Sequence, residues 1–144
     1  MNLRSYRFVF AFLLVGLLLL IRPAAAKDVR PRSPFAGTWA GTYTAMMPNN
    51  TQEGEITATV DDQGNVKGEV WNKTVNQNAT LKGTVNEDGK IKIVFEFPNQ
   101  NQPATADGTV ARTRKGWLTG TMTQRFGMQA TGSIEFDVKP KLKQ

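Results

Sequence analysis

The 144-residue chain contains no cysteine and no histidine. It therefore forms no disulfide, no zinc site of the usual Cys/His kinds and no nucleophile–base pair that needs Cys or His. The rest of the sequence carries no recognisable catalytic motif. We expect a non-enzymatic protein without metal or cofactor, stabilised by its own hydrophobic core.

One long hydrophobic run is present, at the N-terminus. Arg4 and Arg7 precede an apolar stretch over residues 8–21, and Ala24-Ala25-Ala26 supplies the small residues of a cleavage site. This order is typical of a secretory signal peptide, and the run is shorter than the roughly 20 residues of a membrane-spanning helix. The pattern predicts a signal peptide over residues 1–26, a secreted or periplasmic location and a cleaved chain that does not span a membrane.

Beyond residue 26, fifteen basic and twelve acidic residues leave a net charge of +3. The basic residues are scattered along the sequence, so we expect no nucleic-acid binding, which favours a basic face with aromatics. Residues 27–34 contain two prolines and four charges and are interpreted as a flexible leader. Residues 35–139 form one predicted domain, and residues 140–144 a basic tail. No oligomeric state follows from these patterns.

Short alternating segments, separated by Gly, Asn and Asp, fill the domain and predict an all-β fold. No stretch of about a dozen residues has the apolar spacing of a helix. The predicted strands cover residues 37–45, 54–61, 65–72, 78–86, 90–97, 104–112, 116–125 and 129–138.

A repeat supports this division. Ala58-Thr59-Val60, Gly83-Thr84-Val85 and Gly108-Thr109-Val110 recur every 25 residues, each followed by a turn that contains glycine. The carboxylate pairs Asp61-Asp62 and Glu87-Asp88 fall in these turns, where such residues favour turn geometry rather than catalysis. The repeat predicts consecutive hairpins and therefore an antiparallel meander.

Alternation gives the predicted sheet one apolar face and one face of mainly Thr, Lys and Glu. Because no helix is available to cover the apolar face, we expect the eight strands to curl into a closed barrel. A folded-over β-sandwich is the alternative. A further alternative is an outer-membrane barrel whose apolar face points toward lipid.

The opening of the first strand, Gly37-Thr38-Trp39, resembles that of the calycin families, which include lipocalins, fatty-acid-binding proteins and avidins. The resemblance implies an up-and-down barrel in which Trp39 has a structural role across the closed end. It also implies a basic residue over this tryptophan, for which Lys139, Arg112 and Arg114 are candidates.

Small inward residues collect toward the opposite, open end and predict a cavity there. They are Ala79, Ala104, Ala106, Ala130 and Gly132. We expect Phe95, Phe97 and Met122 to line this cavity, with Trp71 near its rim. Asn99 and Gln102 in the adjoining loop are expected to orient the ligand, because amides both donate and accept hydrogen bonds. The predicted function is binding of a small apolar or amphipathic molecule at the open end.

The loops around residues 48–52, 72–78 and 98–103 are rich in Asn and Gln. Binding residues concentrate in loops held by a rigid scaffold. The alternative function is therefore an interaction module with a solid core, which uses these loops on a carbohydrate or a protein.

Overall fold

The computed structural model describes residues 31–142, and the predicted signal peptide lies outside the described residues. The described chain is all-β, as predicted, and contains eight strands. These are β1 (Gly37–Met46), β2 (Thr51–Val60), β3 (Asn65–Asn72), β4 (Gln77–Val85), β5 (Lys90–Glu96), β6 (Ala104–Arg112), β7 (Leu118–Phe126) and β8 (Gln129–Pro140).

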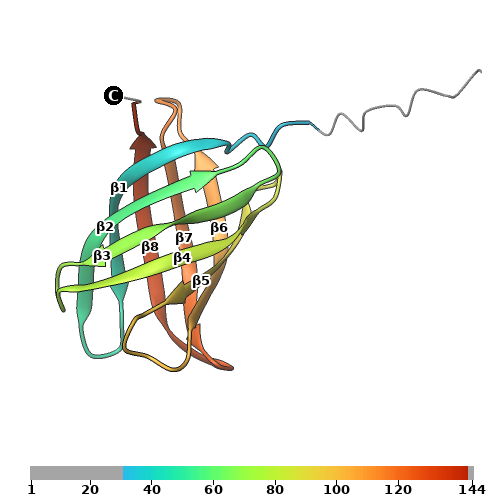
Figure 1. The fold of residues 1–144 in the computed structure, drawn as a ribbon. Helices are drawn as coiled ribbons and strands as arrows, with labels where there is room; N and C mark the ends of the chain where they lie inside the picture. Colours follow the sequence, from blue (N-terminus) through green and yellow to red (C-terminus); the bar gives the residue numbers. More distant parts are fainter. Residues whose placement is uncertain (1–30, 143–144) are drawn as a thin grey trace, which may run out of the picture. The chain divides into compact units, whose positions relative to one another are not determined.

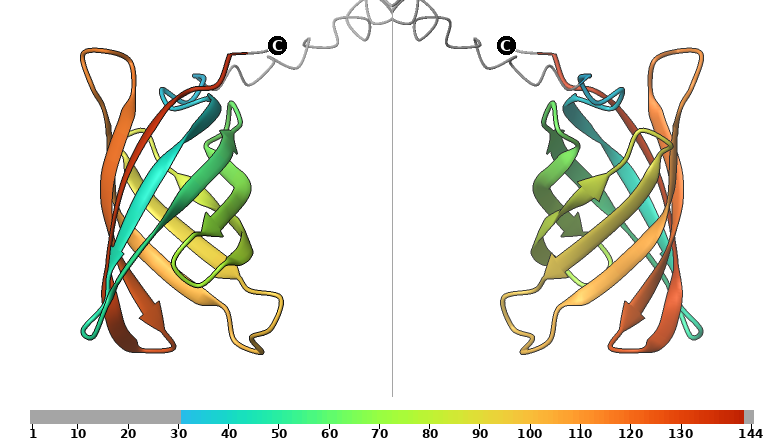
Figure 2. Two further views of the ribbon diagram at one scale, coloured as in Figure 1. Left: turned by 90° about the vertical axis from the view of Figure 1, so that its left-hand side faces the viewer. Right: turned by 90° about the vertical axis from the view of Figure 1, so that its right-hand side faces the viewer.

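The strands form an antiparallel meander that closes into a barrel, because β8 pairs with β1 as well as with β7 (Figures 1 and 2). The predicted barrel is thus confirmed, and the sandwich prediction is wrong. The apolar face points inward, whereas the outer face carries Thr, Lys and Glu, the reverse of the lipid-facing alternative. Among residues 31–142, no helix has the length and hydropathy needed to cross a bilayer.

Two strands extend by two or more residues beyond a predicted end. β2 begins at Thr51 because Thr51, Gln52 and Glu53 pair with the end of β1, which leaves only residues 47–50 as a loop. β8 continues to Pro140, and the backbone N–H of Lys141 still donates to the carbonyl of Thr38 at 2.8 Å. Amide-rich and Lys-rich stretches were interpreted as a loop and a tail, but pairing with β1 extends both strands.

The 25-residue repeat corresponds to three equivalent hairpins. Val60, Val85 and Val110 are buried at or near the ends of β2, β4 and β6. The following turns each contain a glycine with positive φ, at 84° in Gly64, 80° in Gly89 and 79° in Gly116. The hairpins also interlock, since the N–H of Val85 donates to the carbonyl of Gly64 and that of Val110 to Gly89, both at 2.8 Å.

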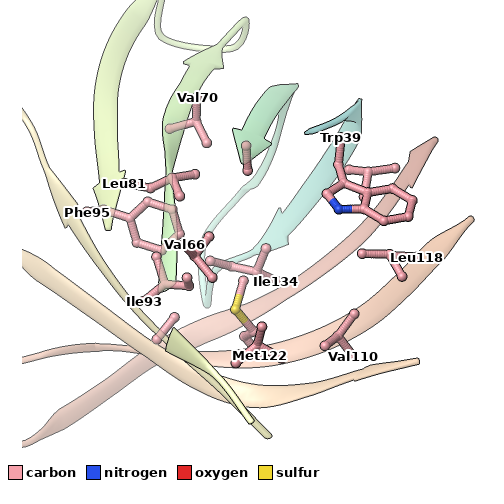
Figure 3. Packing of buried hydrophobic residues seen from close by; sticks show 14 of the residues in the cluster. Trp39, Val66, Val70, Leu81, Ile93, Phe95, Val110, Leu118, Met122 and Ile134 are labelled. Atoms are coloured by element: carbon pink, nitrogen blue, oxygen red, sulfur yellow. The ribbon is translucent and has the colours of Figure 1, made fainter. Parts of the chain in front are cut away.

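The core consists of inward side chains contributed by all eight strands (Figure 3). Alternation assigned most of them correctly because successive side chains on a strand point to opposite faces. Ala130 is an exception and is exposed. A bulge between Gln124 and Arg125 shifts the β7–β8 register there, so the alternation counted from Ile134 no longer holds.

One end of the barrel is closed by Trp39. Its side chain is only 3% exposed, and its indole N–H donates to the carbonyl of Phe35 at 2.9 Å. Arg112 covers the ring, with its guanidinium carbon 5.0 Å from the ring centroid, and donates to the carbonyl of Pro34 at 2.6 Å. Of the three basic candidates, Arg112 therefore lies over Trp39.

The last residues of the predicted leader belong to this closed end. Ser33 is buried and donates its backbone N–H to the carbonyl of Asp62 at 2.8 Å, while Arg32 pairs with the Asp62 carboxylate at 2.6 Å. The unit Pro31–Gln144 thus contains every strand and the whole core cluster. The barrel therefore closes on strands that all belong to this unit.

Candidate functional site

The open end of the barrel is formed by four connections, at residues 47–50, 73–76, 97–103 and 127–128. In Figure 1 the β1–β2, β5–β6 and β7–β8 connections lie opposite the end where β8 finishes. The short turns at residues 61–64, 86–89 and 113–117 lie at the closed end, as the meander requires.

A void of about 40 Å³ lies inside the open end. Phe95, Phe97 and Met122 line it, as predicted from the sequence. The other lining residues are Tyr43, Ala45, Gln52, Ile56, Val70, Asn72, Gln124, Ile134 and Phe136. None of these side chains is charged, so the void is an apolar space with a few amides.

A second void, of about 50 Å³, lies toward Trp39 at the closed end. Ile56, Phe95, Met122 and Phe136 line both voids and therefore form the partition between them. Each of these two voids is far smaller than the roughly 300–1,000 Å³ of a drug-sized ligand pocket. Only a small group fits without a movement of side chains.

The predicted small residues explain less of this space than expected. Ala79, Ala104 and Ala106 are buried, at 2%, 0% and 2% exposure, but none of them lines the open-end void. Ala104 pairs with Phe95 across β5 and β6, so the phenyl ring is available to occupy the room that the alanine leaves. Natural interiors are close-packed, and large neighbours fill such gaps.

Phe97 connects the void with the outer surface. The β4–β5 ladder runs only from Thr80 and Glu96 to Val85 and Ile91, so residues 77–79 lie beyond it. A groove of about 400 Å³ occupies this place, lined by Glu69, Asn78, Ala79, Thr80, Glu96, Phe97 and Pro98. Phe97 lines both spaces and therefore lies between the groove and the void.

Three inward amides, Gln52, Asn72 and Gln124, form the polar part of the lining. Asn72 donates from Nδ2 to Gln52 Oε1 at 2.7 Å, and its Oδ1 accepts from the backbone N–H groups of Thr74 and Val75 at 3.1 and 3.3 Å. Asn72 therefore fixes the β3–β4 loop against β2. Among the hydrogen bonds of residues 31–142, none uses the side-chain amide of Gln124, which leaves it available to a ligand.

Sequence reasoning missed these amides, although the signal was present. Alternation from Ile56, Val70 and Met122 places Gln52, Asn72 and Gln124 on the inward face. Their polar character led to their interpretation as loop or surface residues instead.

The other predicted site residues lie outside the void. Trp71 is on the outer face of β3, is 41% exposed and has Lys73 Nζ at 5.6 Å from its ring centroid. Its indole N–H donates to Asn76 Oδ1 at 3.4 Å. Asn99 and Gln102 are exposed in the β5–β6 loop, and neither lines the void.

Tyr43 is the titratable residue of the void. Its ring lines the void from β1, and burial raises the pKa of its hydroxyl above the ordinary value. The neutral phenol is therefore the form that this environment favours, in keeping with the uncharged lining.

The meander, the closing tryptophan and the covering arginine are consistent with a calycin-like barrel. Comparison with protein-family models, with curated proteins and with solved structures gives no match to this chain.

Proposed function

We propose that the protein is an exported, non-enzymatic barrel that binds a small amphipathic ligand at its open end. The observation that supports this most directly is the uncharged apolar void beneath the inward amides Gln52, Asn72 and Gln124. Ligand sites commonly combine such an apolar lining with a few polar groups that fix orientation.

The size of the void limits the ligand. A space of about 40 Å³ takes only a short apolar group while Phe97 remains in place. If the Phe97 ring moves aside, the void joins the outer groove of about 400 Å³. We therefore expect a slender ligand that enters between β4 and β5, with its apolar part beside Phe95 and Met122.

The chemistry of the lining also limits the polar part of the ligand. Burying a charge is costly unless an opposite charge accompanies it, and the lining offers none. A neutral hydroxyl, ester or amide matches the donor and acceptor of Gln124. The expected ligand class is thus a neutral amphipathic molecule rather than an ionised fatty acid.

The test is titration of residues 27–144 with a neutral environment-sensitive apolar dye. Phe97→Ala removes the separating ring and should increase dye binding, whereas Ala45→Val fills the void and should decrease it. Val60→Ala is the matched control, because it enlarges the interior at the closed end, away from the groove. Dye binding that is unchanged in both Phe97→Ala and Ala45→Val would contradict the proposal, provided near-UV circular dichroism shows native packing.

A second candidate function is carbohydrate binding on the outer face at Trp71. It is favoured by the exposed indole, which lies beside Asn76 and pairs with Asn78 across β3 and β4, and by the small volume of the two interior voids. An indole offers an apolar face and neighbouring amides offer hydrogen bonds. Trp71→Ala should then abolish retention on immobilised polysaccharides while dye binding stays unchanged.

A further inference from the structure

The three closed-end turns share one backbone but differ in charge. In each, the glycine N–H donates back to the first turn residue, from Gly64 to Asp61, from Gly89 to Asn86 and from Gly116 to Thr113, at 2.9–3.1 Å. The two central residues are Asp62-Gln63, Glu87-Asp88 and Arg114-Lys115 in turn order, and the residues after the glycine are Asn65, Lys90 and Trp117. The third turn thus replaces acidic side chains by basic ones and adds a tryptophan.

The end of β8 brings a further basic residue to this third turn. Leu118 pairs with Val138, and Lys139 Nζ lies 4.1 Å from the centroid of the Trp117 ring, with Lys115 Nζ at 5.3 Å. Figure 1 shows the end of β8 and the β6–β7 turn at the same end of the barrel. In the turn itself Arg114 precedes Lys115, and both side chains are exposed.

We name this surface the basic corner; it consists of Arg114, Lys115, Trp117 and Lys139. Its charge is not neutralised within residues 31–142, where the salt bridges are Arg32–Asp62, Lys73–Glu55, Lys82–Glu96 and Arg125–Asp107. Asp137 lies two residues before Lys139, at the edge of the corner. The central residues of the other two turns are acidic or neutral, so among the three turns only this one has basic central residues.

We propose that the basic corner docks on an anionic phospholipid surface. Its three cations complement the lipid phosphates, and Trp117 lies at the boundary between headgroups and acyl chains. Tryptophan favours this boundary, and lysine can bury its apolar stem there while its ammonium group reaches the phosphates.

The arrangement of Trp117 favours lipid over single-stranded nucleic acid. A nucleic-acid site stacks bases on an open aromatic face. Here Lys139 Nζ already lies 4.1 Å from the centroid of the Trp117 ring and Lys115 Nζ 5.3 Å from it, so the ring offers no open face to a base. A tryptophan flanked by lysines gains more from a bilayer interface than from the sugar–phosphate backbone of a nucleic acid.

The acidic turn between β4 and β5 determines the orientation of docking. Glu87 and Asp88 lie at the same end of the barrel but in a neighbouring hairpin, and an anionic surface repels them. The barrel should therefore dock tilted, with β8 and the β6–β7 turn toward the lipid. The open end remains in solution, so this inference does not depend on the ligand proposed above.

The first test is flotation of residues 27–144 with vesicles of phosphatidylcholine, with and without phosphatidylglycerol. We expect binding only to the anionic vesicles and its loss at high salt. Lys115→Gln with Lys139→Gln should weaken binding by more than about tenfold, since each cation near an anionic surface contributes about fivefold. The matched control, Lys67→Gln with Lys92→Gln, removes the same charge from other exposed sites and should change binding by less than about twofold.

The second test locates the contact by fluorescence. Brominated phosphatidylglycerol should quench the docked protein, and Trp117→Phe should abolish the quenching, whereas Trp71→Phe should leave it intact. Equal weakening in the two double variants would overturn the proposal, because the attraction would then reflect net charge alone. Binding to polyphosphate without binding to anionic vesicles would also overturn it and assign the corner to a soluble polyanion.

Discussion

The closed and open ends of the barrel differ in how they fill the space between the strands. The closed end uses one large indole, which has Arg112 over its ring and donates its N–H to the carbonyl of Phe35. The open end uses several medium-sized side chains and inward amides, and it leaves a void that Phe97 separates from an outer groove. A single fixed plug stabilises the barrel, whereas many smaller groups leave the other end able to rearrange.

The largest expected effect is the loss of the closed-end plug. Trp39→Ala removes a side chain that is only 3% exposed and should lower the free energy of unfolding by about 3–5 kcal/mol. Trp71→Ala is the control, because its indole lies on the outer face. Urea denaturation of both variants measures the two free energies of unfolding. An equal decrease in Trp39→Ala and Trp71→Ala would show that Trp39 does not stabilise the closed end.

At the open end, Asn72→Ala should have the next largest effect. The change removes the partner of Gln52 and frees the N–H groups of Thr74 and Val75, at an expected cost of about 1–3 kcal/mol. Asn78→Ala, on the exposed face of the adjacent strand, should cost less than about 0.5 kcal/mol. Hydrogen exchange should also show the β3–β4 loop opening only in Asn72→Ala.

Arg112, which lies over the Trp39 ring, should contribute less to the free energy of unfolding than Trp39 itself. Arg112→Met keeps an apolar stem but removes the cation over the indole and the hydrogen bond to Pro34, which should cost about 1 kcal/mol. Arg114→Met is matched in chemistry and lies in the turn tip, so we expect no measurable change in the urea midpoint. A similar loss in both variants would exclude a specific role for Arg112.

The open end should determine the alkaline limit of stability. Burial raises the pKa of Tyr43, so the folded state holds this proton more tightly than the unfolded state. The resulting stability is present below the ordinary pKa of about 10 and is lost as pH rises through the higher folded value. Tyr43 is the sole tyrosine beyond residue 26, so ultraviolet titration reports it directly, and Tyr43→Phe should flatten the alkaline decline.

The smallest expected effect is on the loss of stability at low pH, and it involves Asp61 at the closed end. The side-chain amide of Asn65 donates to Asp61 at 2.7 Å and lowers the pKa of that carboxyl, with help from backbone N–H groups. The stability that this provides is present above the ordinary pKa and is lost as pH falls through the lower folded value. Asp61→Asn places at this position the residue that the next hairpin has at Asn86. In this variant the melting temperature, measured across the acid range, should depend less on pH than in the unchanged protein.

Sequence patterns predicted the architecture better than the site. Alternation and the repeat gave the meander, and the inward positions of Phe95 and Met122 followed from it. The size of the void did not follow, because it depends on how Phe95 and its neighbours fill the room beside Ala104. Packing of this kind is a property of three-dimensional contacts rather than of residue volume along a strand.

The basic corner was also invisible in the linear sequence, where basic residues look scattered. Lys115 and Lys139 are far apart along the chain, and the β7–β8 pairing brings both to one tryptophan. For Trp71, by contrast, the sequence suggested a place in the site that the structure does not give it. Its place near a loop suggested the rim of the cavity, but its neighbour Asn72 is the residue that points inward.

The interlocked hairpins separate the scaffold of this protein from its surface chemistry. The carbonyl of Gly64 holds the next hairpin through Val85, and that of Gly89 holds the following one through Val110, using only main-chain atoms. The central turn side chains take no part in these bonds, so they can differ between the three hairpins without loss of these contacts. A designer can likewise exchange two residues per turn, and so reverse the sign of the charge at one end, without changing the backbone of the barrel.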